Sequence, residues 1–303
     1  MVEAKKNEVN EKLVLDIVKL HFDEIPKIKK FHSESSYVAE LDFKDFKKVI
    51  KINTSNYDWK IAKEIQIFEI LKNNGIPRPK IYFTNLIETE YPQYYIMEYL
   101  GTRNLMELGN FDSKNSKDLF KQIGVYFAKT HLIKFEAQGK ISTEGILKQS
   151  FSENYKKEFD LFLINLIKLN LLSVLEISNC KKLFSTFQDS NEAVLCHRDF
   201  GPWQVIIDDK TNKINGLIDW EWGVSSCSVA DFARAESLMT IFGCELKFFK
   251  QGYEEIKKLP KNYEEIKIAY KLPQLLSLLY HYTKSKDETN YNKCRKYFDE
   301  LIK

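Results

Sequence analysis

The sequence contains few cysteines, and they lie far apart. Five cysteines occur among its 303 residues, no two of them form a CxxC pair, and their number is odd. This pattern favours neither a structural zinc site nor a framework of disulfides. Reduced thiols in a cytoplasm are the simplest interpretation.

Hydrophobic segments long enough to cross a membrane are also missing. No uninterrupted apolar run approaches the roughly 18 residues of a membrane-spanning helix. The first residues, MVEAKKNEVNEK, are charged and no apolar segment follows them, so they are unlike a secretory signal peptide. We therefore expect a cytoplasmic protein with no membrane partner.

A strong excess of one charge is missing as well. The 46 Lys and Arg residues against 43 Asp and Glu residues leave a net charge of +3. So mild a balance does not favour nucleic acid as a partner. Hydrophobic residues make up 44% of the chain, enough to bury a core in one large or two ordinary domains. We expect a soluble globular protein.

The most informative stretch is LCHRDFGPWQVIIDDKTNKINGLIDWE, at residues 195–221. It holds Asp199 in an HRD tripeptide, Gln204 five residues later and Asp219 at the end of an apolar run. The alternative without function is that HRD is an ordinary loop tripeptide and that Asp219 caps a strand end. The occurrence of both motifs in this order favours a functional cluster instead.

Between the two motifs the residues predict a β-hairpin. Residues 205–207 form one short β-branched strand, residues 214–218 form the return strand, and turn formers lie between them. Because a hairpin brings its two ends together, we expect Asp199, Gln204 and Asp219 to converge. Such a cluster suits phosphoryl transfer: one carboxylate orients the attacking hydroxyl and accepts its proton, while an amide and a second carboxylate hold magnesium.

These residues resemble a known catalytic centre. The HRD segment at 197–199 with Gln204, followed by IDWE at 218–221, is similar to the catalytic loop and metal motif of the aminoglycoside phosphotransferase and choline kinase family. The resemblance implies that Asp199 is catalytic and that Asp219 and Gln204 hold Mg²⁺. It also implies that ATP or GTP donates the phosphate.

The same resemblance implies the two-lobed, protein-kinase-like α+β fold. A small nucleotide-binding lobe with an antiparallel sheet would cover residues 1–100, and a larger, mainly helical lobe that binds the acceptor would cover residues 101–303. Strand alternation in the first part and helical periodicity in the second agree with this division. The elements expected in the first part are a helix at 9–22, strands at 37–43 and 47–53, a helix at 58–74, and strands at 80–84 and 92–99.

The second of these strands carries a lysine, Lys51. Strand alternation places Val49 and Lys51 on one face, which resembles the family strand whose valine contacts adenine and whose lysine holds the phosphates. In the following helix, Glu64 occupies the position from which a family glutamate pairs with that lysine, and Glu69 is the alternative partner. Such an ion pair fixes the direction of the lysine.

Two further segments are similar to the nucleotide site of the family. Residues 94–101 resemble the hinge between the lobes; they include Met97, and the backbone groups of Glu98 and Leu100 would contact the adenine edge. A buried strand that ends in a glycine is the alternative. Residues 31–36, FHSESS, stand where the family has a loop over the nucleotide. That stretch contains no glycine, so Ser35 is its candidate for contacting phosphates, and an ordinary polar turn is the alternative.

The second half of the sequence is expected to be mainly helical. A helix at 116–135 carries His131, which we interpret as a packed, hydrogen-bonded structural histidine. Helices at 151–187 carry no family motif, and the resemblance implies that acceptor specificity lies there. Asp231, within VADFA at 229–233, resembles an acidic residue that supports the catalytic loop through hydrogen bonds.

We therefore expect an ATP- or GTP-dependent phosphotransferase acting on a hydroxyl of a small molecule, such as an aminoglycoside or other antibiotic, choline or a sugar-like alcohol, as a monomer or homodimer. Three departures from the family keep an alternative open: Gln204 replaces the usual Asn, Arg198 replaces the usual Gly, and the covering loop lacks glycine. The alternative is a kinase-fold scaffold that binds nucleotide without transferring phosphate. A protein kinase is disfavoured, because neither an APE motif nor a long activation segment separates Asp219 from Asp231.

Two groups of side chains are candidates for recognising the acceptor. Trp203, Trp220 and Trp222 flank the motifs and suit stacking on a ring or a cage for a quaternary ammonium, or else core packing. Most acidic residues on helices are simply solvated, but some suit a cationic aminoglycoside. These acids are Glu221, Asp287, Glu288, Asp299 and Glu300.

Overall fold

The computed structural model describes residues 9–31, 33, 36–55, 57, 59–87, 90–101, 103–108, 114–208, 211 and 213–303, with the backbone alone for residues 114 and 115. These residues fall into two units. Unit 1 comprises the described parts of Met1–Arg103, Ser142–Glu144 and Ile206–Trp222, and unit 2 comprises those of Asn104–Ile141, Gly145–Val205 and Gly223–Lys303. Most of the predicted hairpin therefore belongs to unit 1, and the HRD segment belongs to unit 2.

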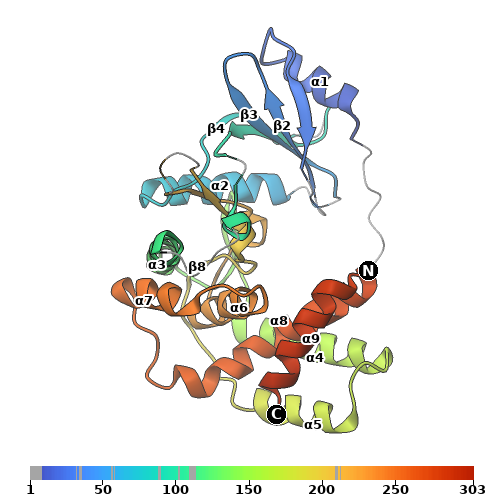
Figure 1. Ribbon diagram of the computed structural model, residues 1–303, viewed down its shortest axis with the longest axis vertical. Helices are drawn as coiled ribbons and strands as arrows, with labels where there is room; N and C mark the ends of the chain where they lie inside the picture. The colour runs from blue at the N-terminus through green and yellow to red at the C-terminus, as the bar shows by residue number, and fades with distance from the viewer. Residues whose placement is uncertain are drawn as a thin grey trace. The chain divides into compact units, whose positions relative to one another are not determined.

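Unit 1 is built on a five-stranded antiparallel sheet (Figure 1). In spatial order the strands are β1 (Lys27–Lys30), β2 (Ser36–Asp42), β3 (Lys47–Asn53), β5 (Tyr94–Glu98) and β4 (Ile81–Asn85). The same unit contains the helices α1 (Glu11–Lys19) and α2 (Trp59–Asn73). The antiparallel sheet and the elements predicted around it are confirmed, whereas β1 was not predicted.

Helix α1 buries its apolar stripe against one face of this sheet. Val14 and Ile17 share a buried cluster with Ile50 and Ile52 of β3, and each fully buried side chain of this size contributes about 1.5–3 kcal/mol. Successive residues of a strand face opposite sides of the sheet. The burial of the two isoleucines therefore turns Lys51, which lies between them, to the other face.

The register of β3 and β5 determines what lies beside Lys51. Lys51 is opposite Tyr95, and Val49 is opposite Met97. Directly opposed residues of an antiparallel pair share a face and lie in contact. Tyr95 therefore stands on the same face as Lys51.

The predicted hairpin is present as β9 (Val205–Ile207) and β10 (Ile214–Leu217), which pair in a two-stranded sheet. The short 3₁₀-helix η3 (Trp220–Trp222) follows β10 and contacts α2. The Leu217 amide donates a hydrogen bond to the Pro77 carbonyl at 2.9 Å, which joins β10 to the segment after α2. These contacts bring the residues after β10 next to helix α2.

Unit 2 is mainly helical (Figure 1). Its helices are α3 (Lys114–Thr130), α4 (Phe151–Lys168), α5 (Val174–Phe184), α6 (Ser228–Ile241), α7 (Leu246–Ile256), α8 (Tyr263–Ser285) and α9 (Glu288–Leu301). A four-stranded sheet accompanies them, in the order β7 (Gly145–Lys148), β6 (Gly139–Ser142), β11 (Val224–Ser226) and β8 (Val194–Cys196). Two short 3₁₀-helices, η1 (Leu105–Leu108) and η2 (Pro202–Gln204), contact each other. The predicted α+β class is confirmed, whereas this second sheet was not predicted.

Helices α3 and α7 approach each other closely through two glycines. A Cβ atom on Gly124 of α3 would collide with the carbonyl oxygen of Phe249, and one on Gly252 of α7 would collide with that of Lys121. Only glycine permits backbones to approach so closely. This contact holds α7, which carries Tyr253, against the C-terminal part of α3, next to His131.

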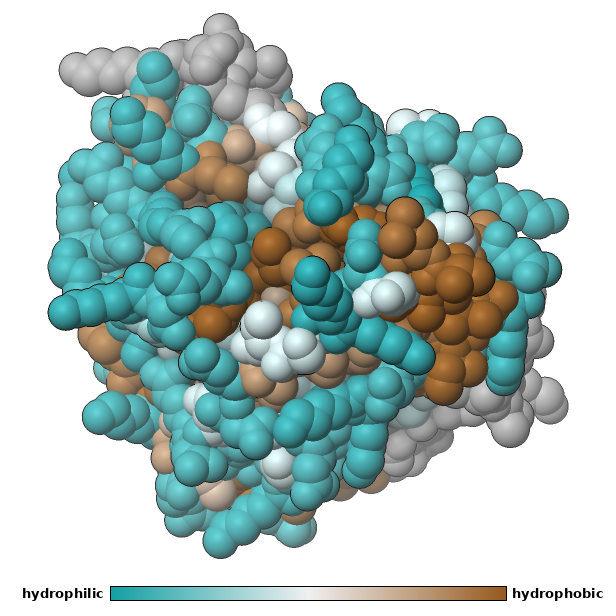
Figure 2. Space-filling view, turned by 90° about the horizontal axis from the view of Figure 1, so that it is seen from below, coloured by the Kyte–Doolittle hydropathy of each residue, from teal (hydrophilic) through white to brown (hydrophobic). Residues whose placement is uncertain are grey.

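Figure 2, a view from below, shows hydrophobic residues gathered on part of the surface. Several large apolar side chains of α4 and α5 are exposed. They are Leu161, Ile164, Val174 and Leu175. In the described part of the chain, no helix has the length and apolar character needed to span a membrane.

Candidate functional site

Lys51 lies at the centre of a buried cluster of charges in unit 1. Its Nζ is 2.8 Å from Glu64 Oε2, 3.0 Å from Asp219 Oδ1 and 3.4 Å from Glu221 Oε2. The Lys51 side chain is only 7% exposed. The structure thus brings together the lysine of β3, the glutamate of α2 and the aspartate that follows β10, all three of which were singled out from the sequence.

Glu64 is fixed by three donors. Besides Lys51, the Tyr95 hydroxyl donates to Oε2 at 2.9 Å, and the Trp220 amide donates to Oε1 at 3.1 Å. Burial raises the pKa of the Tyr95 phenol well above its ordinary value, so this hydroxyl keeps its proton and can donate. Glu69, the alternative partner of the lysine, is instead half-exposed and paired with a surface lysine.

Glu221 and Lys60 extend the cluster, and sequence reasoning did not place them there. Glu221 Oε1 accepts a hydrogen bond from Lys60 Nζ at 3.0 Å, and the Lys60 ammonium lies over the Trp222 indole, 4.8 Å from the ring centroid. Glu221 was a candidate for a cationic acceptor, but a carboxylate that is 3% exposed binds the lysines instead. One feature of the sequence could have indicated that Lys60 lies near this cluster: it stands one helical turn before Glu64, on the same face of the helix.

The charges of this cluster leave a negative excess. Burial alone would lower the pKa of the Lys51 ammonium, but Asp219 and Glu64 hold it well above its ordinary value. Two ammonium groups, of Lys51 and Lys60, face the three carboxylates of Glu64, Asp219 and Glu221. Fully ionised, these five groups carry a net charge of −1, which favours a cation nearby.

Asp219 has the properties of a magnesium ligand. Its side chain offers hard carboxylate oxygens, the type that Mg²⁺ prefers, and is 42% exposed although its neighbours are buried. Its backbone φ of +65° lies in the left-handed region, which aspartate tolerates better than most residues. Strained backbone of this kind occurs often at functional sites. The residue present therefore fits the predicted cation.

The residues expected around adenine lie in unit 1. The apolar members are buried, namely Val49, Met97 and Leu100. The Glu98 amide donates to the Lys80 carbonyl at 2.8 Å, and the Leu100 carbonyl accepts from the Asn215 side chain at 2.6 Å. Part of the hinge backbone is thus engaged within the fold, and its contact with adenine stays a prediction. Ser35, the candidate for phosphate contact, lies outside the described residues.

In unit 2, Asp231 holds the backbone of the HRD segment. The His197 amide donates to Asp231 Oδ2 and the Arg198 amide donates to Oδ1, each at 2.7 Å. Asp231 lies in the first turn of α6 and is 1% exposed, while Asp199, which follows the two bonded amides, is half-buried. These hydrogen bonds agree with the supporting role predicted for Asp231.

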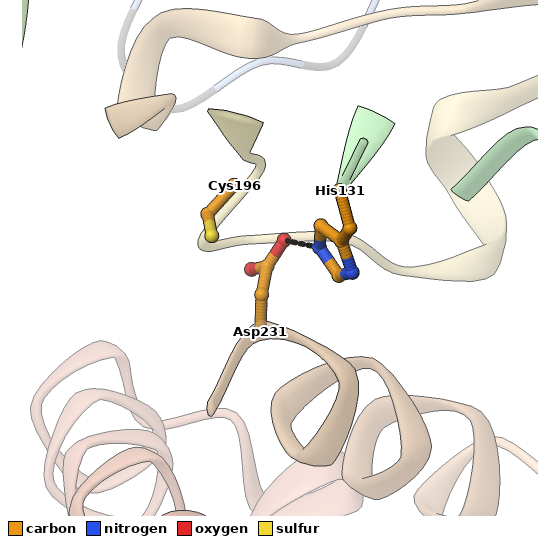
Figure 3. Close-up of side chains that lie close together, drawn as sticks. All are labelled: His131, Cys196 and Asp231. Atoms are coloured by element: carbon orange, nitrogen blue, oxygen red, sulfur yellow. Dashed lines mark hydrogen bonds and ion pairs between the residues drawn. The ribbon is translucent and has the colours of Figure 1, made fainter. Parts of the chain in front are cut away.

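His131 is a structural histidine, as predicted. Its Nε2 lies 3.1 Å from Asp231 Oδ2 and its Nδ1 lies 2.7 Å from the Tyr253 hydroxyl. Figure 3 shows Asp231 between His131 and Cys196. Through these contacts His131, which directly follows α3, and Tyr253 of α7 support the same carboxylate that supports the HRD segment.

The trio of His131, Cys196 and Asp231 also has the spacing of a metal site, since one ligand atom of each lies within 4.8 Å of the others. Burial alone would raise the pKa of the Asp231 carboxyl. Its hydrogen bonds, of which the one from His131 has the largest effect, instead hold this pKa below its ordinary value. Burial raises the pKa of the Cys196 thiol well above its ordinary value. Both ring nitrogens of His131 are engaged, by Asp231 and Tyr253, so His131 and Asp231 form a hydrogen-bonded support beside Cys196.

The amide of Gln204 is turned toward its own loop. Its Oε1 accepts a hydrogen bond from the Gly201 amide at 2.6 Å, and the residue is 1% exposed. This bond closes the short helix η2. The carbonyl oxygen of an amide has a second lone pair, which could still bind a metal. The contact that the structure gives, with the Gly201 amide, shapes the loop. The metal-binding role of Gln204 stays a prediction.

The expected site residues are divided between the two units. Asp199 and Gln204 belong to unit 2, whereas Lys51, Glu64 and Asp219 belong to unit 1. The contacts within each unit are those described above. The convergence of all five on one nucleotide stays a prediction.

The three tryptophans near the motifs have different environments. Trp220 is fully buried and its indole donates to the Leu217 carbonyl at 3.3 Å, so it is a core residue and cannot stack on an acceptor. Trp203 is half-buried and packs edge-to-face on Phe242, with ring centroids 4.9 Å apart. Trp222 is 46% exposed. Only the last two present surface to a ligand.

Comparison with known proteins supports this interpretation of the fold. The family described as "Phosphotransferase enzyme family" matches residues 35–247, and no curated protein matches significantly. A thermostable mutant of aminoglycoside phosphotransferase APH(4)-Ia, solved with AMP-PNP and hygromycin B, is similar with a TM-score of 0.73 and 14% identity, over 95% of this chain and 97% of that chain.

Two other solved structures are similar to the chain. Aminoglycoside 2'-phosphotransferase-IIIa with GDP gives a TM-score of 0.69 and 12% identity, over 96% of this chain and 97% of that one. A protein from Haemophilus somnus 129PT, provisionally named fructosamine-3-kinase, gives a TM-score of 0.65 and 17% identity, over 96% of this chain and 97% of that one. At these identities the structural likeness establishes the fold alone.

Proposed function

The chain belongs to the phosphotransferase enzyme family, and from this premise we propose that it transfers the γ-phosphate of ATP or GTP to a hydroxyl group of a small molecule. The observation that carries the proposal is the contact of Lys51 Nζ with both Glu64 and Asp219. It places an ionised ammonium beside a carboxylate suited to magnesium. Transfer of a phosphoryl group depends on such positioning and charge neutralisation.

Lys51 would hold the phosphates of the donor nucleotide. Its ammonium is fixed by Glu64, which is itself held by Tyr95 and by the Trp220 amide. The side chain is therefore directed before the nucleotide binds, which reduces the entropy lost on binding. The nucleotides named with the similar solved structures, AMP-PNP and GDP, are of the class that we propose for this chain.

Asp199 would act on the acceptor. Its carboxylate would accept the hydroxyl proton while the hydroxyl oxygen forms a bond to the γ-phosphorus and the bond from that phosphorus to the β–γ bridging oxygen breaks. The products are a phosphate ester and a nucleoside diphosphate. A positioned general base of this kind contributes typically about 10²–10⁴-fold to the rate.

Magnesium would be held by Asp219, with Gln204 as the second proposed ligand, and when bound it neutralises charge on the phosphate oxygens. In the described structure the Gln204 oxygen accepts from Gly201, so Asp219 is the better supported ligand. The engagement of the Gln204 oxygen by Gly201 also favours the second candidate function, a kinase-fold scaffold that binds nucleotide without transferring its phosphate.

The proposed acceptors are aminoglycosides, other antibiotics, choline and sugar-like alcohols. We propose that the protein acts on them in the cytoplasm; its five cysteines are buried free thiols.

Two measurements on the purified chain separate the candidate functions. The first is release of nucleoside diphosphate from ATP or GTP with magnesium, against pooled aminoglycosides, amino alcohols and sugars. The second is nucleotide affinity by calorimetry. Acceptor-dependent release that is lost in Asp199→Asn supports the phosphotransferase. Nucleotide binding without release in any pool favours the scaffold, and absence of both contradicts the two candidates together.

A further inference from the structure

Arg198 has a backbone conformation that its side chain disfavours. Its φ is +71°, in the left-handed region where the Cβ of an L-residue comes too close to the following carbonyl oxygen. Glycine alone adopts this region freely, and a residue with a long side chain stays there only if its surroundings hold it. Arg198 is immediately followed by Asp199, so whatever holds Arg198 also directs the proposed base.

Helix α4 supplies one part of that hold, through Glu158. Arg198 Nη2 donates to Glu158 Oε2 at 2.8 Å, and Arg234 Nη1 of α6 donates to Glu158 Oε1 at 3.1 Å. The Nε of Arg234 in turn donates to the backbone carbonyl of Arg198 at 2.8 Å. One carboxylate thus binds the side chain of the left-handed residue and also the guanidinium that fixes its backbone.

The three groups are largely withdrawn from water. The side chains of Arg198, Glu158 and Arg234 are 25%, 18% and 11% exposed. Burial alone would raise the pKa of the Glu158 carboxyl, but the two guanidinium groups hold it below its ordinary value. The carboxylate is therefore ionised near neutral pH, and charge-assisted hydrogen bonds of this kind are roughly twice as strong as neutral ones.

We propose that Glu158 is a positioning residue, which keeps the HRD segment in its left-handed turn by binding Arg198 and Arg234 together and so directs Asp199. Asp231 fixes the amides of His197 and Arg198 from α6, while Glu158 fixes the Arg198 side chain and, through Arg234, its carbonyl. The family usually has glycine at this position, where no such hold is needed. The catalytic part of the inference rests on the proposed function.

This account predicts that glycine at position 198 makes Glu158 unnecessary. Glu158→Gln keeps the shape of the side chain and removes its charge, so the turn loosens and turnover falls about tenfold, the scale of one weakened charge-assisted hydrogen bond. The KM for nucleotide should stay within about twofold, because the change lies outside the nucleotide site. In the double variant Glu158→Gln/Arg198→Gly most of the lost turnover should return, since glycine adopts the turn without help.

Glu153→Gln is the matched control. Glu153 lies on the same helix, with a side chain that is 73% exposed, and the substitution is chemically identical. Its turnover and loop exchange should equal those of the wild type. Should Glu158→Gln fail to fold, Arg234→Lys is the second variant, because lysine keeps a positive charge toward Glu158 but loses the Nε that binds the Arg198 carbonyl.

The deciding readout is hydrogen–deuterium exchange of the amides at 197–199, which does not depend on turnover. Faster exchange in Glu158→Gln, reversed in the double variant and absent in Glu153→Gln, supports the positioning role even if no acceptor is phosphorylated. Equal exchange in the wild type and in Glu158→Gln, or a double variant no slower in exchange than Glu158→Gln alone, overturns it. A protein that shows the exchange pattern but never releases nucleoside diphosphate contradicts the proposed function and leaves the positioning role standing.

Discussion

Lys60 and Glu221 form an ion pair at 3.0 Å in the interior of unit 1, where their side chains are 5% and 3% exposed. The net stabilisation by such a buried pair is small, but removing one partner leaves the other charge uncompensated. Without Lys60, Glu221 would have only Lys51 as a cationic partner among the five charged groups of the cluster, and Lys51 is also bound to Glu64 and Asp219. We infer that the pair limits how strongly Glu221, whose Oε2 lies 3.4 Å from Lys51 Nζ, draws this lysine away from Glu64 and Asp219.

We predict that Lys60→Met lowers the free energy of unfolding by about 3 kcal/mol, the usual cost of leaving one charge of a buried pair unpaired. Nucleotide affinity should fall as well, because Lys51 is drawn toward Glu221. Urea unfolding and calorimetry measure the two effects. Lys72→Met, which removes an exposed partner of Glu69 on the same helix, should remain close to the wild type. Equal effects of the two substitutions would contradict the account of the buried pair.

The ion pair of Lys51 and Glu64 gives a second prediction. Lys51→Ala should weaken nucleotide binding strongly, and Glu64→Ala should weaken it more mildly, because the glutamate acts by directing the lysine. Once the lysine is absent, the loss of Glu64 should cost little more, so the double-mutant cycle should be non-additive by at least about 0.5 kcal/mol. Additive losses of affinity would show that the two residues do not act as a pair.

A third prediction concerns magnesium. Asp219→Ala should abolish turnover, whereas Gln204→Asn should retain or raise turnover at limiting magnesium, because asparagine brings the same amide oxygen on a shorter side chain. Gln204→Ala should in addition lower the free energy of unfolding by about 1–3 kcal/mol, since the Gly201 amide loses its acceptor. The measurement is turnover against magnesium concentration. If the curves of the wild type and both Gln204 variants coincide, Gln204 is not a metal ligand.

The acid sensitivity of the protein should depend on Glu158. The groups that face its carboxylate are Arg198 of the HRD segment, Arg234 of α6 and Tyr155 of its own helix. Its pKa in the folded state lies below the ordinary value of 4.5, so the stability that it contributes is present above that value. It is lost as the pH falls below 4.5 through the lower folded-state pKa.

Melting temperatures of the wild type and Glu158→Gln should therefore converge as the pH is lowered from about 6 through this window. Other carboxylates that titrate there are common to both proteins and cancel in the difference. A difference in melting temperature that stays constant, or that widens toward acid, would show that Glu158 is not held ionised by the two arginines.

Much of unit 1 was predictable because its signals are local. Strand β3 carries apolar residues on both sides of Lys51, and in α2 the apolar residues Ile61, Ile65, Phe68 and Leu71 recur at helical spacing. Lys51 and Glu64 are separated by one strand end and one helix start, so their pairing followed from the pattern and the resemblance. The contact of Lys60 with Glu221 joins residues 161 positions apart, and a contact of that range leaves no local pattern.

The second sheet of unit 2 was missed for a related reason. Its strands have three or four residues each, too few for an alternation to be recognised. Strand β11 pairs with β6 and with β8, which precede it in the chain by many residues. Short strands of this kind are stabilised by tertiary packing, and composition alone does not reveal them.

The left-handed turn at Arg198 was also beyond a sequence argument. Arginine in place of glycine was visible as a departure from the family. The contacts that hold Arg198 in this conformation come from side chains of α4 and α6. The backbone conformation is the one that glycine adopts, and side chains distant in sequence secure it. On the positioning role that we propose for Glu158, these contacts compensate for the missing glycine.

The proton-accepting role of Asp199 is the central claim, and turnover of Asp199→Asn against wild type with one acceptor from the pool tests it most directly. Asparagine cannot take the hydroxyl proton, so turnover should fall by about 10²–10⁴-fold, while nucleotide affinity measured by calorimetry on the same preparation should be nearly unchanged. An Asp199→Asn protein that turns over at the wild-type rate would contradict the account.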